Sequence, residues 1–548
     1  MMNIKNTISS FFLVLICSTV WAQKQKMPVV QPAVFKKDTF SIVKYGAKSD
    51  GVFLNTSAIN NAIIACSKNG GGVVLIPEGF WLTGPIEIKS GVNVHLKKAA
   101  LLQFTKDFNQ YPLVKGNWEG LPQMRNQSPI WATGATNIGI TGFGIIDGGG
   151  DAWRMVKKDK LTETAWKRLV GSGGVLSDDK KTWYPSESSF KGSKLQNPGV
   201  LKEDKTESFY TEVKDFLRPN MLVLTQCKKI LLEGVTFQNS PAWCLHPLMS
   251  EHITVRNITV LNPWYAQNGD GIDLESCKNV LIENSIFDVG DDGICIKSGR
   301  DEEGRKRGMP TQDVIVRNCT VYHAHGGFVI GSEMSGGAKN IFVDNCTFVG
   351  TDIGLRFKTT RGRGGVVENI FVNNTVMKDI VGEAILFDMY YAAQDPIALA
   401  GEKREPPKVE SLPVTEATPQ FRNIYVNGVV CNGAEKAIFV RGLPEMNVKN
   451  IMLQNMVLQA DKGLDMTEGT DITLQNVQLI TKEKDPVLTV HNSKNITLDK
   501  ITYPSADLLL SVSGEKSAGI VMKETATKNA KKGVAFAYGA KEDALKLK

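Results

Sequence analysis

Apolar and polar positions alternate along most of the chain in one short recurring pattern. Each copy begins with a polar residue followed by Ile or Val, continues with alternating apolar and polar residues, and ends near Asn or Gly. Examples are KKILLEGVTF from Lys228, EHITVRNITV from Glu251 and KNIFVDNCTF from Lys339. The first Ile or Val of successive copies lies at positions 230, 253, 280, 314, 341, 370, 424, 451, 472 and 496. A repeat sustained at this spacing is typical of proteins built from stacked coils.

The length and the period of the repeat together predict the kind of coil. A period of two predicts β-strands, and each copy is too short to hold a strand, a helix and a return strand. We therefore expect each coil to close through turns, with Asn and Gly at its corners, and to pair with the coils above and below it. This fold is an all-β parallel β-helix, or solenoid. The alternative, a β-sandwich of many short strands, does not require one pattern at near-constant spacing.

Three regions depart from the repeat. Near the N-terminus, Asn55 offers a helix N-cap and apolar residues follow at helical spacing through Cys66, which predicts a short capping helix over the first coil. The repeat disappears from about 148 to 218, where a large insertion carries three tryptophans. A shorter interruption covers residues 392–420. We expect both interruptions on the same side of the solenoid, because inserts in repeat proteins map to loops of one face.

The first 22 residues predict a secretory signal peptide. Lys5 precedes an apolar stretch, and Ala22 supplies a small residue before a cleavage site. The alternative, a membrane anchor, is disfavoured because the apolar stretch is short and interrupted by Ser and Thr. We therefore expect export to the periplasm or the extracellular space. Residues 23–548 would then form one β-helix domain, which includes the insertion.

Composition and charge exclude several classes of protein. With 42% hydrophobic and 22% charged residues among 548, the chain is typical of a packed globular protein. The net charge of +7 is spread without a basic block, so we expect no nucleic acid partner. No later segment is apolar for long enough to span a membrane. Eight cysteines remain after Cys17 leaves with the signal, which allows disulfides and equally allows buried thiols. We expect a monomer.

Polar residues gather in three consecutive copies of the repeat. Asn268 and Asp270 lie in NGDGID, the pair Asp291 and Asp292 in VGDDG, and His325 in HAHGG. Asp291 and His325 follow the first Val of their own copies by the same number of residues. Equal offsets in a stacked coil place two side chains above one another on one face. Asp270 precedes Asp291 by nearly one coil, so it should lie beside them.

Each of these residues has a structural explanation when taken alone. Asp-Gly and Asn-Gly pairs form turns, and a lone His or Arg is more often part of a solvated surface. Three carboxylates on one face repel one another, however, which is typical of sites whose pKa values are pushed apart. Arg356 and Lys358 occupy alternate positions of the next strand and would share that face. The set suits glycoside hydrolysis, in which one carboxylic acid protonates the leaving oxygen and a second carboxylate activates water.

At these motifs the chain resembles the polygalacturonase family of pectin-degrading glycoside hydrolases, which are right-handed parallel β-helices. The family pattern Asn-x-Asp, Asp-Asp, His-Gly and Arg-x-Lys occurs here in the same order, and the likeness extends through NSPAWCLHP from Asn239. Two positions depart from the common pattern. Gly269 stands where many members have Thr, as in exo-acting relatives, and Ala324 stands where Gly usually precedes the histidine. Neither change removes a reactive group.

The resemblance implies a role for each candidate catalytic residue. Asp291 would be the general acid, and His325 would support it. Asp270 and Asp292 would position and deprotonate the attacking water. Direct attack by water inverts the anomeric centre, and the carboxyl groups of such enzymes stand roughly 6.5–9.5 Å apart. We therefore expect an inverting hydrolase with that spacing, and the family implies neither a cofactor nor a metal.

The resemblance also implies the contacts with the substrate. Arg356 and Lys358 would bind the sugar carboxylate on the leaving-group side, because a cation and a carboxylate form a strong charge-assisted bond. Asn268 would contact the substrate as well, and Tyr391 would close this subsite, although Tyr390 lies beside it in the sequence. The expected partner is thus a pectic polysaccharide or oligogalacturonide. We expect the long insertion to close one end of the groove, which predicts exo-attack from the non-reducing end.

Three other functions remain as alternatives. A rhamnogalacturonan hydrolase has the same fold, but relatives with that specificity tend to lack the cationic pair. A pectate lyase uses calcium, which clustered carboxylates could bind, yet Asp291-Asp292 and His325 match the hydrolase pattern. A solenoid that only holds glycans, such as an adhesin, would tolerate loss of the carboxylates. We expect polygalacturonase activity in preference to all three.

Overall fold

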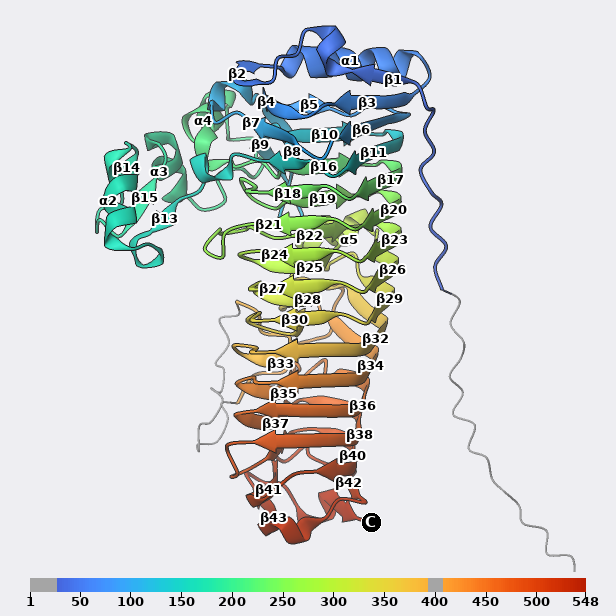
Figure 1. Ribbon diagram of the computed structural model, residues 1–548. Helices are drawn as coiled ribbons and strands as arrows, with labels where there is room; N and C mark the ends of the chain where they lie inside the picture. The colour runs from blue at the N-terminus through green and yellow to red at the C-terminus, as the bar shows by residue number, and fades with distance from the viewer. Residues whose placement is uncertain (1–26, 393–407) are drawn as a thin grey trace, which may run out of the picture.

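The computed structural model describes residues 27–392 and 408–548, so the predicted signal peptide, 1–22, lies outside the described residues. Figure 1 shows a long column of stacked coils with the N-terminal elements at one end and the C-terminal elements at the other. Each complete coil contributes three strands, for example β17 (Lys228–Glu233), β18 (Thr236–Gln238) and β19 (Leu245–Leu248). Each strand pairs in parallel with its counterpart in the next coil. Three ribbons of strands therefore run along the column, which confirms the predicted parallel β-helix.

The first ribbon contains the repeated Ile and Val positions and runs the whole length of the column. Its strands are β1 (Thr39–Ser41), β3 (Gly72–Ile76), β6 (Val92–Leu96), β11 (Thr136–Gly142), β17, β20 (Glu251–Arg256), β23 (Lys278–Glu283), β26 (Thr311–Arg317), β29 (Ala338–Asp344), β32 (Val366–Lys378), β34 (Gln420–Asn432), β36 (Val448–Ala460), β38 (Gly469–Thr481), β40 (Lys494–Thr502), β42 (Ile520–Lys523) and β44 (Leu545–Leu547).

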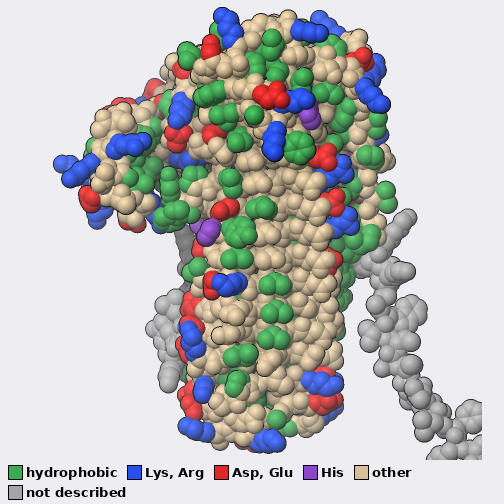
Figure 2. All heavy atoms as spheres, in the orientation of Figure 1, with side chains coloured by type: hydrophobic (Ala, Val, Ile, Leu, Met, Phe, Trp, Pro, Cys, Tyr) green, Lys and Arg blue, Asp and Glu red, His purple; other side chains and the backbone are tan. Residues whose placement is uncertain are grey.

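The second ribbon is separate only in the N-terminal two thirds of the column, because β32 pairs with strands of both ribbons. Its strands are β2 (Asp50–Leu54), β4 (Gly79–Thr83), β7 (Ala100–Phe104), β12 (Ile145–Asp147), β18, β21 (Thr259–Leu261), β24 (Ile286–Asp288), β27 (Thr320–Tyr322) and β30 (Thr347–Val349). Figure 2 shows a face of the column whose middle carries rows of hydrophobic side chains and few charges.

The third ribbon carries the candidate catalytic motifs at the N-terminal ends of its strands. These strands are β5 (Ile86–Glu87), β10 (Ile130–Thr133), β16 (Leu222–Thr225), β19, β22 (Ile272–Glu275), β25 (Asp292–Lys297), β28 (Gly326–Ile330), β31 (Leu355–Lys358), β33 (Glu383–Asp388), β35 (Lys436–Arg441), β37 (Lys462–Thr467), β39 (Leu488–His491), β41 (Ala506–Ser513) and β43 (Ala530–Ala537).

The register of the first ribbon matches the sequence repeat at every copy. Ile230 pairs with Ile253, Ile253 with Val280, and the series continues without a slip to Ile496. These side chains point into the column, and Ile253 and Val280 have no exposed surface. Burial of each such side chain stabilises the fold by roughly 1.5–3 kcal/mol. A one-residue slip would turn the whole row outward, so this pattern fixes the register.

Asparagines take the corners between the ribbons. Asn284, Asn318 and Asn345 have φ angles of 51°, 54° and 52°, in the left-handed region that Asn adopts more readily than most residues. The Asn318 side-chain amide donates to Asn284 Oδ1 in the previous coil at 3.1 Å. The recurring Asn of the sequence pattern therefore closes the corner of its own coil and links it to the next.

The N-terminal end of the column is covered as predicted. Helix α1 (Thr56–Lys68) begins after Asn55 and lies across the first coil (Figure 1). Its buried side chains follow the expected helical spacing and are Ala58, Ile59, Ala62, Ile63 and Cys66. The helix therefore shields the open end of the core from water, as the end coil of a solenoid requires.

The long insertion leaves the column between β12 and β16 and has two parts. A distal lobe, residues 156–184, contains β13 (Val156–Lys157), α2 (Glu163–Gly171), β14 (Val175–Leu176) and β15 (Thr182–Tyr184), and it has a small core around Trp166 and Trp183. A basal part contains α3 (Glu187–Ser193) and α4 (Glu207–Glu212). Figure 1 shows the lobe projecting from the column, and Figure 2 shows that it carries side chains of both charges.

A β-hairpin on the same side of the column was not predicted from the sequence. The antiparallel hairpin of β8 (Leu113–Trp118) and β9 (Leu121–Asn126) leaves the column between β7 and β10. Its residues Leu113 and Met124 pack against Leu217 and the rest of the basal part of the insertion. The hairpin and the basal part therefore form one body beside the third ribbon.

The two interruptions of the repeat adjoin opposite ends of third-ribbon strands, but residues 393–407 of the second one lie outside the described residues, so the expectation that both share a side stays a prediction. The long insertion precedes β16, whereas the second interruption follows β33. Because the strands are parallel, their N-terminal ends all lie along one edge of the ribbon and their C-terminal ends along the other. Helix α5 (Asp301–Arg307), which follows β25, lies at the C-terminal edge, where its Arg305 pairs with Glu416 of the described end of the second interruption at 3.5 Å. Loops therefore flank the third ribbon on both sides.

The eight cysteines after the predicted signal peptide are all buried free thiols. Of the two states that the sequence allowed, the structure therefore has the reduced one. Among the described residues, the helices are all too short or too polar to cross a membrane.

Candidate active site

The motif residues meet at the N-terminal edge of the third ribbon. Asp270 lies just before β22, Asp292 begins β25, and His325 lies just before β28. Asp292 pairs with Gly326, so Asp291 and His325 occupy neighbouring positions in adjacent coils. Arg356 and Lys358 lie in β31, one coil further toward the C-terminus. The solenoid thus brings six motif residues from four consecutive coils onto one surface.

The three carboxylates lie closer together than expected. One oxygen each of Asp270, Asp291 and Asp292 lies within 4.8 Å of the other two. The expected separation of roughly 6.5–9.5 Å across the cleaved bond is therefore wrong for the nearest oxygens. The reason is that Asp291 and Asp292 are consecutive residues of one coil, and Asp270 comes from the adjacent coil, whose strand lies about 4.8 Å away.

Asp292 is held as an anion by two cations. Its Oδ2 accepts a hydrogen bond from Lys358 Nζ at 2.8 Å, and its Oδ1 accepts one from Arg356 Nη1 at 3.3 Å. Burial by itself would raise the pKa of Asp292, but these two cations, with help from Lys297, hold that pKa well below its usual range. Both carboxylate oxygens are therefore occupied, and the two cations favour the ionised form of the group.

The pKa of Asp270 is shifted in the opposite direction, although Asp270 is also a buried aspartate. It is 2% exposed, and one of its oxygens has no hydrogen-bond partner among the described residues. Burial, followed by the charges of Asp273 and Asp291, raises the pKa of Asp270 well above its usual value. Asp273, on the next outward-facing position of β22, has its pKa raised well above normal by burial as well. Burial and like charge therefore favour the protonated form of these two carboxyl groups, whereas the cations favour the ionised form of Asp292.

Asp291 is the carboxylate that solvent reaches most easily, with 21% of its side chain exposed. Its Oδ1 faces His325 Nδ1 at 3.1 Å, and its Oδ2 accepts the backbone N–H of Asn268 at 3.2 Å. The hydrogen bond with Asp291 raises the pKa of His325, and Asp352, whose Oδ2 lies 3.8 Å from His325 Nε2, adds to this effect. A protonated His325 stabilises the anion that Asp291 becomes after it gives up a proton.

The cationic side of the site ends in an aromatic ring. Lys358 Nζ lies 5.0 Å from the ring centre of Tyr391, and the Arg356 guanidinium carbon lies 5.8 Å from it. Adjacent Tyr390 is instead buried against Arg441, 5.3 Å away. Of the two tyrosines, Tyr391 therefore lies beside the cationic pair.

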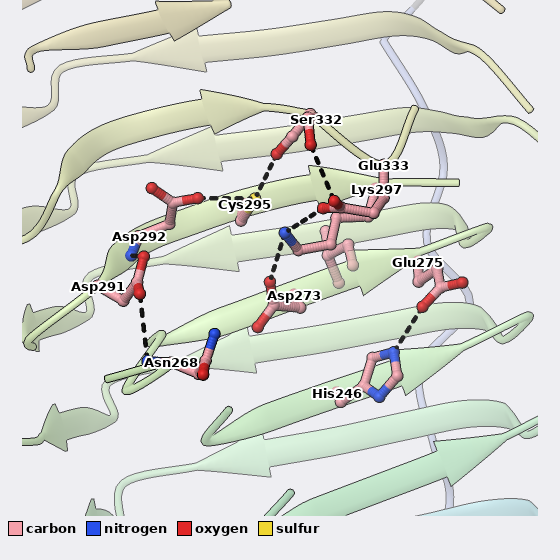
Figure 3. A network of polar contacts seen from close by, with 12 residues as sticks. His246, Asn268, Asp273, Glu275, Asp291, Asp292, Cys295, Lys297, Ser332 and Glu333 are labelled. Carbon is pink, nitrogen blue, oxygen red and sulfur yellow. Dashed lines mark hydrogen bonds and ion pairs between the residues drawn. The ribbon is translucent and has the colours of Figure 1, made fainter. Parts of the chain in front are cut away.

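A buried network under the site was not predicted from the sequence. Figure 3 shows Lys297 pointing toward Asp273 and Glu333, at 3.5 Å and 3.1 Å. The Lys297 ammonium also lies 4.8 Å from the ring centre of Trp243, which belongs to the NSPAWCLHP segment. In the same figure His246 faces Glu275 at 2.9 Å. The alternation of apolar and polar residues could have predicted that these side chains face outward. It could not predict that they are buried, because the elements that cover them are distant in the sequence.

Arg218 is a second unpredicted member of the site. Its Nη2 donates to Asn268 Oδ1 at 2.8 Å, and its Nη1 donates to the carbonyl oxygens of Pro241 and Gln267 at 3.0 and 2.9 Å. Burial lowers the pKa of Arg218 to about 10, so it stays charged. Arg218 thus fixes the loop that carries Asn268 and Asp270. Arg218 lies at the end of an insertion that has no repeat, so no sequence pattern predicts its role.

The carboxylate cluster is poorly suited to a divalent cation. Asp270, Asp291 and Asp292 could together surround an ion. However, Asp292 already pairs with Lys358 and Arg356, and these positive charges would repel a metal ion. What the cluster provides instead is a carboxylate whose ionised form is favoured, neighbours whose protonated form is favoured, and a solvent-accessible carboxyl group, which are the components of acid–base hydrolysis of a glycosidic bond.

The fold and the site therefore define a parallel β-helix glycoside hydrolase. Residues 199–411 match the family model described as Glycosyl hydrolases family 28. The crystal structure of a hyperthermoactive exopolygalacturonase from Thermotoga maritima is 31% identical, has a TM-score of 0.66, and covers 82% of this chain and 93% of its own. The chain belongs to glycosyl hydrolases family 28 and is a polygalacturonase-type glycoside hydrolase.

Relatives by sequence include proteins with different modes of attack. A probable polygalacturonase of Vitis vinifera is 29% identical over 428 residues, which are 76% of this chain and 74% of the relative. An endo-polygalacturonase of Pectobacterium carotovorum subsp. carotovorum is 28% identical, over 73% of this chain and 84% of the relative. Similarity at this level is compatible with either exo- or endo-attack, so the shape of the groove must decide between them.

Proposed function

We propose that the chain hydrolyses α-1,4-galacturonosyl bonds of pectin with inversion, and that it acts from the non-reducing end. The observation that carries the substrate assignment is the cationic pair Arg356 and Lys358 beside Tyr391, one coil beyond the carboxylates. The pair carries two positive charges and Asp292 balances only one of them, so one positive charge remains for a substrate carboxylate, which galacturonate has and a neutral sugar lacks. This argument favours galacturonan over rhamnogalacturonan.

The proposed chemistry follows from the protonation states. Asp291, which solvent can reach, protonates the leaving oxygen, and His325 stabilises the resulting carboxylate. Asp292 is ionised before the reaction and accepts a proton from the attacking water. Asp270 holds that water by a hydrogen bond. Asn268 positions Asp291 through its backbone N–H and presents its side chain, fixed by Arg218, toward the substrate.

The stereochemical outcome needs a separate argument, because the short carboxylate spacing resembles the roughly 5–5.5 Å of retaining enzymes. A retaining enzyme requires a carboxylate that attacks the sugar itself. Asp292 is buried and Lys358 and Arg356 hold its two oxygens in place, so it cannot move onto the sugar carbon, whereas it can accept a proton from a water molecule that lies between them. Water is then the better nucleophile, and inversion follows. Proton NMR of the first product should show the β-anomer, and an α-anomer or a trapped glycosyl-enzyme would contradict this proposal.

The direction of the substrate follows from the same assignment. If Arg356 and Lys358 bind the sugar on the leaving-group side, that side faces the C-terminal coils. The sugar at the non-reducing side of the bond must then lie toward the N-terminal coils, where the hairpin and the long insertion stand beside the third ribbon. Exo-attack predicts galacturonic acid as the main early product and a slow fall in viscosity. A ladder of mid-sized oligomers at low conversion would contradict it.

The calcium-dependent lyase alternative can be tested in the same assay. The proposed hydrolysis uses side chains only, so treatment with a chelator and back-titration with calcium should leave galacturonic acid release unchanged. Release of an unsaturated, ultraviolet-absorbing product that depends on calcium would support the lyase. Product release that survives Asp291→Asn would support a binding function without catalysis.

We also propose that the protein is exported to the periplasm or the extracellular space. The support is the N-terminal sequence, with Lys5, an apolar stretch and Ala22 before the expected cleavage site. N-terminal sequencing of the exported protein should begin at Gln23. An uncleaved protein that stays in the cytoplasm would contradict the proposal.

A further inference from the structure

The exposure of the third ribbon falls sharply on the N-terminal side of the carboxylates. His325 and Asp291 have 48% and 21% of their side chains exposed. One and two coils toward the N-terminus, the outward-facing residues Asp273 and His246 have no exposed surface, and Lys297, at the far end of the strand that begins with Asp292, has 4%. Charged residues are rarely buried unless something covers them and pairs with them. A separate element must therefore lie over the floor of the groove at this point.

The covering element is the hairpin of β8 and β9, residues 113–126, which we call the strap. Its Trp118 stacks on Trp243 with ring centres 5.3 Å apart and an angle of 20° between the rings. Arg125 lies over the other side of this pair, 3.9 Å from the Trp118 ring centre. Both tryptophans are buried. A stack of this kind adds about 0.5–1.5 kcal/mol beyond the burial of area, so the strap is fixed to the floor.

The tip of the strap reaches the opposite edge of the ribbon. The strap is rooted before β10, at the N-terminal edge, yet the backbone N–H of Arg300, which follows β25 at the C-terminal edge, donates to Gly120 O at 3.3 Å. Glu119 and Arg300 form an ion pair of 3.3 Å beside this contact. Gly120 has a φ of +75°, and a Cβ atom there would lie 2.5 Å from Arg300 N. A glycine is therefore required for the tip to dock.

The strap is also connected to the loop of the proposed site residues. Arg125 donates to the carbonyl oxygen of Arg218, which in turn holds Asn268. The distal lobe of the insertion, in contrast, has its own small core. It approaches the column where Lys160 lies 4.6 Å from the exposed ring of Trp264. That contact is on the outer side of the loop before Asn268, and Figure 1 shows the lobe projecting away from the coils.

We propose that the strap, and not the distal lobe, closes the groove on the non-reducing side and so limits each cleavage to the terminal sugar. This inference rests on the proposed exo-attack and names the element that causes it. A polymer that continued past the carboxylates would have to pass through the stacked pair Trp118 and Trp243. The substrate is therefore a galacturonan chain with a free non-reducing end, threaded toward the strap.

The test compares variants that detach the tip with a matched variant that does not. Gly120→Val places a branched side chain against the backbone of Arg300, and Trp118→Ala removes the stack. Gly116→Val is the control, because a Cβ atom at Gly116 in the same hairpin would come no closer than 3.9 Å to any neighbour. A second control replaces residues 158–181 of the distal lobe by Asn-Gly, which joins the paired ends Lys157 and Thr182. Thermal melting checks that each variant is folded.

Products of polygalacturonate and of oligogalacturonides blocked at the non-reducing end are measured at low conversion. Gly120→Val and Trp118→Ala should release dimers and longer products and should cleave the blocked oligomers at least roughly tenfold faster, a change of about 1.4 kcal/mol in barrier. Both controls should keep the monomer profile. This is a gain of activity, which misfolding cannot imitate. If Gly120→Val does not fold, Trp118→Ala carries the test, because it adds no atoms.

The outcomes separate this inference from the proposed function. A ladder of oligomers from the unaltered protein contradicts exo-attack itself. Monomer alone from the unaltered protein and from every folded strap variant overturns the role of the strap and leaves exo-attack standing. A change of product profile on removal of the distal lobe assigns the closure to the lobe and also overturns the inference.

Discussion

Neighbouring charges give two identical side chains opposite properties in this site. Asp270 and Asp292 are both buried and both face the same surface, yet the pKa of the first is raised and that of the second lowered. Burial acts on both in the same direction, so the difference comes from Lys358 and Arg356, which reach Asp292. The division of labour among the carboxylates is thus set by the coil that carries the cations.

Replacing the proposed general acid should remove activity without harming the fold. Asp291→Asn keeps the shape of the side chain but cannot transfer a proton, so kcat should fall at least ~10²-fold, the usual scale for general acid catalysis. A matched control is Asp288→Asn, because Asp288 also pairs with a histidine, His323, at 2.9 Å but lies on the second ribbon. The control should keep full activity. Equal kcat values for the two variants would place the acid elsewhere.

Removing a cation should change both substrate binding and the pH profile. Lys358→Ala removes a charge-assisted partner of the substrate carboxylate, so galacturonate turnover should fall roughly tenfold or more. It also removes the largest stabilisation of ionised Asp292, whose pKa then rises, so the acidic limb of kcat should move to higher pH. The control is Lys378→Ala, an exposed lysine that pairs with Asp379. A lower kcat with an unmoved acidic limb would show that Lys358 does not control the ionisation of Asp292.

His325 should set the alkaline limb of activity. Its pKa is raised, so the protonated form is fully present below the ordinary value near 6.5 and is lost as the pH rises through the higher folded value. Activity that depends on protonated His325 should therefore fall on that side. His325→Gln should lower kcat and shift the alkaline limb, whereas His323→Gln should do neither. An unchanged profile in His325→Gln would limit His325 to a structural role.

At the scale of elements, the repeat determines what could be predicted. The markers from Ile230 to Ile496 fix strands, register and inward-facing side chains, because a period of two leaves only one face for the core. The strap could not be predicted in this way. Its sequence from Leu113 to Asn126 has no repeat, and its docking partner Arg300 is far away in the chain. The repeat likewise does not show at which strand end a loop leaves.

The corner asparagines give a prediction about stability. Asn318 has a φ of 54° and donates to Asn284, so Asn318→Ala should lose both the left-handed tolerance and the hydrogen bond. Placing Ala in that conformation costs roughly 1–2 kcal/mol. Asn318→Gly keeps the backbone conformation and loses only the hydrogen bond, so its melting temperature should lie between those of Asn318→Ala and the unaltered protein. Equal melting temperatures for the two variants would show that backbone strain is not the cause.

At the scale of the whole molecule, the stacking of coils predicts which motif residues meet in the candidate site. It does not predict the residues that surround them. Asp291 and His325 could be placed together because their offsets from the markers are equal, and the structure has them 3.1 Å apart. The spacing of the carboxylates was misjudged because Asp291 and Asp292 are neighbours in one coil and Asp270 lies in the adjacent coil, so the geometry of the coils, and not the requirement of the reaction, fixes it. Arg218, Lys297 and Trp243 escaped prediction because their burial depends on the strap and the insertion, which meet them only in three dimensions.

The molecule consists of one long core and one small independent core, and these should respond differently to a protease. The core of the column runs without a break from Ile42 to Met522, so cleavage there requires opening of many coils at once. The distal lobe has a core of a few residues around Trp166 and Trp183 and carries exposed lysines, including Lys180 and Lys181. Mild trypsin treatment should therefore cut within residues 158–181 first and leave the column intact.

Because the strap stays docked, the nicked protein should keep its activity and its product profile. Mass spectrometry of the fragments together with product chromatography checks both parts. First cuts within the coils, or a new product profile after cleavage in the lobe, would show that the lobe and the column act as one unit.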